Sequence, residues 1–229
     1  MPKEQVTDQS MTVPRAAEVL LETRLPYLTA DQRREVLRTT ALPAGYALLD
    51  EGFEQWGRLN LFAAADGYGM FDTDVEVTVD AAAGGFAAAD AWRGDIGGPG
   101  ALTKRGTGTL TLTGANHHTG GTTLEAGVLT TGSRNTLGRG DVSVRGGTLR
   151  VAAPLRVHGV HGQGAGTTLA VTVSDDGEPA VSVAHRALVS ADGNTLAVTL
   201  DTEHPPTPGS TAPARPRPSW PTTSSRHAP

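Results

Sequence analysis

The chain has 229 residues, of which 38% are hydrophobic and 19% are charged, and this low apolar content argues against a large hydrophobic core. Nineteen Lys and Arg residues against 24 Asp and Glu give a net charge of −5, which disfavours nucleic acid as the main partner. The sequence has no cysteine, which excludes disulfides, thiol nucleophiles and thiolate metal sites.

The first residues carry no targeting pattern. Residues 1–10, MPKEQVTDQS, lack the apolar stretch of an export signal, and no run of eighteen apolar residues occurs anywhere. We therefore expect no signal peptide in this chain and no membrane span, and we expect residues 1–13 to be disordered.

Residues 14–43 are expected to form two short helices. The first is predicted over about residues 15–24, because Pro14 suits the start of a helix. The second is predicted over about residues 30–39, where Thr29 and Gln32 have the spacing of a capping box. Helices this short are marginal alone and must pack on another element. One hypothesis is that this element is missing from the chain.

Residues 44–98 form an aromatic and Gly-rich connector with expected β-strands. The segment VEVTV, residues 75–79, alternates as a half-buried strand does. Several aspartates in this region do not follow the spacing of a calcium-binding loop. We interpret them as solvated turn carboxylates, with a metal site as the alternative; they are Asp72, Asp74, Asp80, Asp90 and Asp95.

The strings LLETRLPYLTADQRREVLRTTALPAGYALLD, WGRLNLFAAADGYGMFDTDVEVTVDAAAGGF and AWRGDIGG resemble the region after the catalytic domain of bacterial type 2 phosphatidic acid phosphatase-related acid phosphatases. The resemblance covers about residues 14–150. It implies relatedness to the carboxyl-terminal part of such an enzyme and an extracytoplasmic location, which means secreted, periplasmic or at the cell surface.

The catalytic residues that this resemblance implies do not appear in the chain. The family uses a Lys with a later Arg-Pro, a Pro-Ser-Gly-His segment, and a Ser-Arg segment followed by His and Asp. The partial matches fail in spacing or context; they are Lys3, residues 41–46, Ser133 with Arg134, and Ser225 with Arg226 and His227. We therefore expect no catalytic, cofactor-binding or metal-ligating residue and no cofactor. The sequence favours a chain without enzymatic activity over an enzyme.

Residues 99–200 form a β-repeat region. A short alternating strand recurs along this region, and each copy contains one leucine at the same place, which we call a marker leucine. Successive marker leucines are 19, 20, 20 and 27 residues apart, and a period near twenty is typical of stacked repeats. Residues 93–219 contain no Phe, Trp or Tyr, which suits thin coils. The fold class is therefore mainly β, a short right-handed parallel β-solenoid, with an antiparallel β-sandwich as the alternative. The marker leucines are Leu110, Leu129, Leu149, Leu169 and Leu196.

The segment GGPGALTKRGTGTLTLTGANHHTGGTTLEAGVL resembles the passenger-associated strand repeat of bacterial autotransporters. The usual form of that repeat has Asn-Thr-Tyr where this chain has Asn116, His117 and His118. This departure concerns a position that usually holds an aromatic residue. The resemblance implies stacked β-strands for this segment.

The histidines of the repeat region invite a metal-site hypothesis. His117 and His118 are adjacent, and neighbouring residues of a strand point to opposite faces, which spoils them as a chelating pair. His158 and His161 lie among glycines in an expected turn. We interpret these histidines as solvent-facing turn residues. The Gly-rich strings at residues 106–108 and 162–166 are interpreted as turns rather than phosphate-binding loops.

Residues 201–229 are rich in Pro, Ser and Thr and are expected to be a disordered tail, either the end of a truncated product or a surface-spanning linker.

Three hypotheses describe the function of the chain. The leading hypothesis is a non-catalytic fragment or accessory region of a secreted acid phosphatase-like protein, whose partner is a catalytic domain absent from this chain. The alternative is an autotransporter passenger-type surface or adhesion module that contacts a cell surface or glycans. An enzyme with an unrecognised site is a third hypothesis. Open strand edges at the solenoid ends predict self-association.

Overall fold

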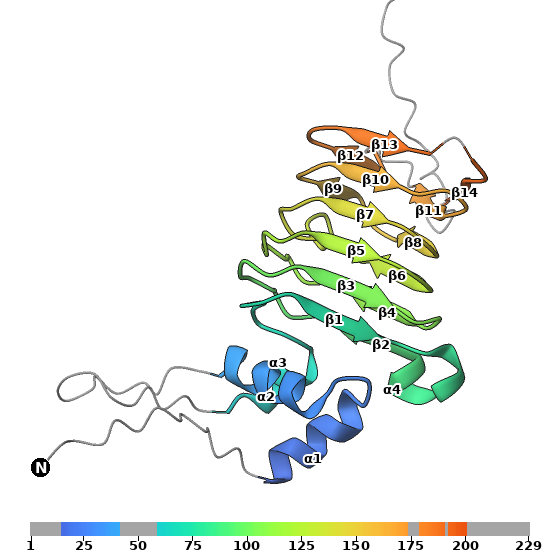
Figure 1. Cartoon of the computed structure of the whole chain (residues 1–229). Coiled ribbons are helices and arrows are strands. Elements are labelled where there is room, and N and C mark those ends of the chain that lie inside the picture. The colour runs from blue at the N-terminus through green and yellow to red at the C-terminus, as the bar shows by residue number, and fades with distance from the viewer. Residues whose placement is uncertain (1–14, 42–58, 174–178, 191, 201–229) are drawn as a thin grey trace, which may run out of the picture.

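The computed structural model describes residues 15–41, 59–173, 179–190 and 192–200. Three short helices lie at one end of a stack of parallel strands (Figure 1). They are α1 (Arg15–Arg24), α2 (Ala30–Thr39) and α3 (Leu61–Ala65), and together they are called the helical cap. The disorder predicted for residues 1–13 and 201–229 lies outside the described residues.

Within the described residues, the strands form two six-stranded sheets and one two-stranded sheet. The first sheet has the order β1 (Val75–Thr78), β3 (Leu102–Arg105), β5 (Thr122–Leu124), β7 (Val142–Val144), β10 (His161–Gln163) and β13 (Ala187–Val189). The second sheet has the order β2 (Ala89–Trp92), β4 (Thr109–Leu112), β6 (Val128–Thr131), β8 (Thr148–Val151), β11 (Thr168–Val173) and β14 (Thr195–Leu200). The small sheet pairs β9 (Leu155–Val157) with β12 (Val181–Val183).

Each turn of the chain contributes one strand to the first sheet and one to the second, and the described strand pairings are parallel. Parallel neighbours need a crossover connection, which here is the opposite half of the same coil. The expected parallel β-solenoid is therefore confirmed, and the antiparallel sandwich is wrong. A glycine with positive φ, such as Gly106 at 75° or Gly147 at 78°, makes the corner between the two strands of a coil.

The marker leucines stack on one another in register. Leu110 pairs with Leu129, Leu129 with Leu149, Leu149 with Leu169, and Leu169 with Leu196. Leu110, Leu129 and Leu149 are buried between the two sheets. The period of about twenty residues therefore corresponds to one coil, as the sequence predicts.

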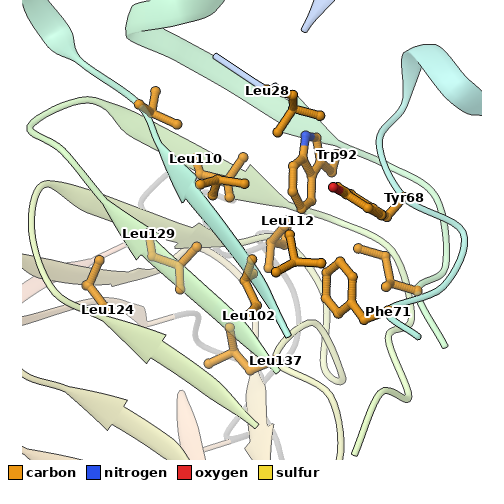
Figure 2. Close-up of a cluster of buried hydrophobic side chains, with 14 of the residues drawn as sticks. Leu28, Tyr68, Phe71, Trp92, Leu102, Leu110, Leu112, Leu124, Leu129 and Leu137 are labelled. Carbon is orange, nitrogen blue, oxygen red and sulfur yellow. The ribbon is translucent and has the colours of Figure 1, made fainter. Parts of the chain in front are cut away.

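The helices lie where they are predicted, and the capping box of Thr29 and Gln32 is present. Leu21 on α1 and Leu37 on α2 belong to the same core as Trp92 of the first coil. Leu28, between the two helices, belongs to this core as well, and Figure 2 shows it together with Trp92. The hypothesis that their packing partner is missing from the chain is therefore wrong.

The first coil is formed by β1 and β2, with a 3-10 turn (Ala81–Ala83) and the short helix α4 (Gly85–Ala88) between them. The solenoid thus begins inside the segment that the sequence assigned to the connector. At this end the helical cap satisfies backbone carbonyls of both strands: Gln32 Nε2 donates to Glu76 O at 2.7 Å, and Arg24 Nη2 donates to Ala91 O at 3.2 Å. The helical cap therefore covers the strand edge that the first coil would otherwise expose.

Candidate functional site

Asp90 lies at the junction between the helical cap and the solenoid. It pairs in register with Leu110, so it occupies the inward position that leucine holds in the next coils, and it is buried. Arg24 Nη1 lies 2.5 Å from Asp90 Oδ1, and the Tyr27 hydroxyl donates to Asp90 Oδ2 at 2.5 Å. The Trp92 indole nitrogen donates to the Tyr27 oxygen at 2.7 Å. The interpretation of Asp90 as a solvated turn carboxylate is therefore wrong.

This network, formed by Arg24, Tyr27, Asp90 and Trp92, is called the junction network. Burial and the negative charge of Asp90 raise the pKa of Tyr27, so its hydroxyl stays protonated and donates. The network joins a helix to a strand more than sixty residues away, since Arg24 and Asp90 are 66 positions apart. Its role is to fix the helical cap on the first coil.

The other aspartates of this region hold turns and edges together. Asp74 accepts from Ala101 N at 2.9 Å, Asp95 accepts from Ala115 N at 2.7 Å, and Asp80 accepts from Ala82 N at 3.0 Å. The hydrogen bond from Ala82 lowers the pKa of Asp80. Asp72 is bonded to Arg38. Within the described ranges, no three His, Asp or Glu side chains are grouped as a metal would need.

His118 is buried, so its interpretation as a solvent-facing residue is wrong. Its ring packs edge-on against Phe71, with 5.1 Å between the ring centroids. It therefore fills the aromatic position of the repeat with an imidazole. Its Nε2 lies 3.2 Å from Thr122 Oγ1, whose own hydroxyl donates to Leu137 O. That arrangement makes Nε2 the donor and leaves Nδ1 without a partner among the described residues.

His161 is also buried, on β10, with Nε2 3.2 Å from Gln163 Oε1. The expectation of a turn residue is wrong for it too. His117 is exposed and His158 is half-buried. The opposite orientation of His117 and His118 is confirmed, because one ring faces solvent and the other faces the core.

Burial lowers the pKa of His118 to about 4, whereas an unfolded histidine titrates near 6.5. Between these values the unfolded chain binds a proton that the folded chain does not, so stability falls as pH decreases from 6.5 to 4. The expected loss from this residue is on the order of 3 kcal/mol. His118→Phe should flatten the dependence of the free energy of unfolding on pH over this range, as measured by urea denaturation. An unchanged slope in the variant would contradict the assignment. His161 retains its own, separate contribution, because burial lowers its pKa as well.

Lys104 has a fully buried side chain inside the solenoid. Its Nζ donates to Gly106 O at 2.8 Å, Gly108 O at 2.5 Å and Ala126 O at 2.9 Å. Burial lowers the pKa of Lys104 to about 8, while the three carbonyl oxygens favour the charged form. The ammonium group thus ties the corners of two successive coils together.

At the far end of the solenoid, the last described strands are β13 and β14. The outer edges of β13 and β14 have no described strand beside them. Several apolar side chains there are more than half exposed, and this set is called the open end: Leu188 at 53%, Val189 at 62%, Leu196 at 65% and Val198 at 55%. Leu196 is in register with the half-buried Leu169 and Val198 with the buried Val171, so both occupy inward positions that a further coil would cover. This surface is a candidate protein interface.

We expect the open end to cause self-association, whereas the capped end should not. The double variant Leu196→Lys with Val198→Lys should be monomeric at concentrations where the unaltered chain associates, because charged side chains block edge pairing. Light scattering after size-exclusion chromatography measures this. Leu20→Lys, on the exposed face of α1, is the matched control and should associate as the unaltered chain does. A monomeric unaltered chain at high concentration would contradict the expectation.

Of the partial catalytic matches, Ser133, Arg134 and the first residue of 41–46 lie in the described part of the chain. Ser133 Oγ donates to Gly114 O at 3.2 Å and so supports a loop. Lys3, residues 42–46 and Ser225–His227 lie outside the described residues. Within the described part, no helix has the length and apolarity to span a membrane.

Comparison with known proteins defines the class of repeat. Residues 102–130 match the family model described as Passenger-associated-transport-repeat. This segment runs from β3 into β6 and so covers two successive coils. The chain therefore contains an autotransporter passenger-associated repeat, and the resemblance that the sequence shows to this repeat is confirmed.

Several curated proteins are similar to the chain. An "Extracellular serine protease" of Serratia marcescens is 33% identical over 153 residues, covering 52% of this chain and 14% of that protein. The "Neisserial autotransporter lipoprotein NalP" of Neisseria meningitidis is 34% identical over 128 residues, covering 54% of this chain and 11% of that protein. The "Adhesin BmaC autotransporter" of Brucella suis is 40% identical over 77 residues, covering 31% of this chain and 2% of that protein.

The chain thus spans at most 14% of the length of these relatives. The matches are to autotransporter and extracellular proteins, and none of these three relatives is named a phosphatase. They support the passenger-repeat part of the sequence resemblance and give no support to the phosphatase part.

Proposed function

We propose that the chain is a passenger-type repeat region that acts at or outside the cell surface as a non-catalytic contact module. The observation that carries this proposal is the match of residues 102–130 to the passenger-associated repeat, on two stacked coils of a parallel solenoid. The names of the similar proteins, which include an adhesin and extracellular proteins, support an extracellular or cell-surface location.

The outer faces of the solenoid suit a polar, extended partner. On the second sheet, one outward position is in register from strand to strand and holds threonine on all but one of five neighbouring strands. In order along the stack, its residues are Thr109, Val128, Thr148, Thr168 and Thr195. Neighbouring strands lie about 4.8 Å apart, so these hydroxyl groups form a row that Val128 interrupts at one strand. A row of this kind offers repeated hydrogen bonds to a repeating polymer such as a glycan.

The first sheet carries a row of alternating charges. Arg105 Nη1 lies 2.7 Å from Glu76 and its Nε lies 2.6 Å from Glu125, while Arg145 lies 3.8 Å from Glu125. Because these charges neutralise one another and are exposed, they contribute little stability. They keep this face polar and resistant to edge-on or face-on aggregation.

The test of location is antibody labelling of intact cells that make the protein, compared with permeabilised cells. We expect equal labelling of both, because the module is outside. Labelling that appears only after permeabilisation would contradict the proposal. A cytoplasmic protein of the same cells is the control and should be labelled only after permeabilisation.

The fragment hypothesis for an acid phosphatase-like protein makes a different prediction. Purified chain mixed with a catalytic domain of that class should form a complex, whereas the contact-module proposal expects none. Hydrolysis of para-nitrophenyl phosphate by the purified chain alone would contradict both, because both describe a non-catalytic chain.

A further inference from the structure

We propose that the cleft between the helical cap and the second sheet binds an acidic oligosaccharide through a uronate-type carboxylate and the adjoining sugar ring. This cap cleft has a volume of about 470 Å³. The lining residues that matter are Arg24, Phe86, Asp90, Arg93, Thr109 and Thr111. The inference rests on the contact role proposed above and names its ligand class.

Arg24 supplies a cation that is already held in position. Its Nη1 lies 2.5 Å from the buried Asp90 and its Nη2 donates to Ala91 O at 3.2 Å. Its side chain keeps 18% of its surface exposed. A guanidinium has five N–H donors in a fixed plane, so donors remain for a ligand carboxylate. Little conformational entropy is lost when this arginine binds, since the protein already fixes it.

Phe86 supplies an exposed aromatic face. It lies on α4, which replaces a simple corner in the first coil, and 47% of its surface is exposed. The Arg24 guanidinium carbon lies 4.4 Å from the centre of the Phe86 ring. A large aromatic side chain that is only half-buried beside polar groups provides a stacking platform for the apolar face of a sugar ring. The cation and the platform are therefore in contact with each other.

Arg93 and the two threonines complete the cap cleft. The Arg93 side chain is 61% exposed and its Nη1 lies 3.1 Å from Asp66 Oδ1, an exposed pair that leaves the guanidinium accessible. Thr109 and Thr111 point outward from β4 and offer hydroxyl groups as donors and acceptors. Because Asp90 is buried and already bound by Arg24 and Tyr27, its charge is offset. The charged residues that line the cleft are Arg24, Arg93 and Asp90, so the lining carries one net positive charge on a chain whose net charge is −5.

The combination determines the ligand chemistry. Two guanidinium groups select a carboxylate, the phenyl ring selects a flat apolar surface, and the threonines select hydroxyl groups. A neutral sugar would leave the remaining N–H donors of both guanidinium groups without a carboxylate acceptor, and a simple anion would leave the aromatic face unused. A hexuronate oligomer satisfies all three.

The experiment is calorimetric titration of the purified full chain with tetragalacturonate at low ionic strength. We expect saturable one-site binding that weakens with salt. Fully methyl-esterified tetragalacturonate keeps the rings and removes the charge, and it should bind at least about tenfold more weakly. Phe86→Ala and Arg93→Gln should each reduce the affinity about tenfold or more, as loss of a central aromatic or arginine contact does.

The control variants carry the same changes elsewhere. Phe62→Ala removes a 90% exposed phenylalanine outside the cleft, and Arg145→Gln removes an exposed arginine of the first sheet. Both should bind as the unaltered chain does. Circular dichroism of each variant verifies folding, and Arg24 and Asp90 are left unchanged because they hold the helical cap.

Three results would overturn the proposal: no binding by the folded chain, equal binding of the ester, or unchanged affinity in both cleft variants. Binding by the purified chain is independent of where the chain is located, so failure here leaves the surface role standing. The source of the sugar is distinguished by two further titrations, one with chondroitin oligosaccharides from a host and one with acidic polysaccharide from the envelope of the producing cell. Preference for one assigns the source, and failure of both together with tetragalacturonate counts against the acidic sugar.

Discussion

Asp90→Ala is expected to lower the free energy of unfolding by about 3–5 kcal/mol, because breaking a buried ion pair leaves the other charge uncompensated. Arg24 would keep its guanidinium against the first coil with no carboxylate, and the Tyr27 hydroxyl would lose its acceptor. Urea denaturation followed by circular dichroism measures the change. Asp66→Ala is the matched control, since its pair with Arg93 is exposed, and it should change stability by less than about 0.5 kcal/mol.

A double variant at Asp90 and Arg24 separates the effect of the lost charges from the effect of the lost side-chain volume. Asp90→Leu restores the residue type of the marker row, and Arg24→Met removes the charge while keeping a long side chain. The pair should recover most of the loss, because replacing a buried ion pair by apolar groups is often neutral or stabilising. Tyr27 and Trp92 remain hydrogen-bonded to each other. A loss under about 1 kcal/mol in Asp90→Ala would mean that the junction network does not hold the helical cap.

Lys104→Met is expected to destabilise the solenoid by about 3 kcal/mol or more, because three backbone carbonyl oxygens lose their common donor. Gly108 O would keep its bond from Val128 N, whereas Gly106 O and Ala126 O would lose the donor that Lys104 supplies. Leaving one buried acceptor unpaired costs about 1–3 kcal/mol. The methionine fills nearly the same volume, so the effect reports the hydrogen bonds rather than a cavity. Thermal and urea denaturation both measure it.

Arg105→Met is the control for Lys104. It is the next residue on β3, faces solvent and makes only exposed ion pairs with Glu76 and Glu125. We expect a loss of at most about 1 kcal/mol. Equal stability of the two methionine variants would show that Lys104 does not tie the coils together.

The sequence predicts the periodic parts of the fold well. Helix α1 is predicted from Pro14 and helix α2 from the capping box of Thr29 and Gln32, and both are local signals. The stack of coils is predicted from leucines that recur with a period near twenty, because each coil must bring the chain back to the same position before its strands can pair with those of the previous coil. Local capping and long-range periodicity are both properties of the sequence itself.

The buried polar residues are predicted poorly, although signals exist for them. Asp90 and Trp92 precede Leu110 and Leu112 by one period of twenty, and they pair with them in register. Lys104 shares the inward face of Leu102 by simple alternation. Asp90 and Lys104 are charged, and charged side chains are seldom buried, but the strand register places both on the inward face. Only the structure supplies the compensating partners, Arg24 and Tyr27 for Asp90 and three carbonyl oxygens for Lys104.

His118 illustrates a different limit. The sequence places it where the repeat usually has an aromatic residue, but its glycine-rich surroundings favour a solvent-facing turn. The outcome depends on Phe71, which comes from a segment about fifty residues earlier and packs on the imidazole ring. Contacts across such distances are set by the coil register, which sequence periodicity defines only within the repeats. The sequence does not predict the cap cleft for the same reason, because its lining residues Arg24, Phe86 and Thr109 are far apart in the sequence.

The parallel register underlies the junction network, the Lys104 bonds and the cap cleft, and one distance tests it directly. Spin labels on Thr103→Cys and Leu188→Cys lie on outward positions of β3 and β13, four rungs apart in the first sheet. The absence of native cysteine makes the labelling specific. Pulsed electron paramagnetic resonance should give a narrow distribution near about 19 Å, with an allowance of several ångströms for the label arms. A broad distribution, or a separation beyond about 30 Å, would contradict a stack of parallel coils.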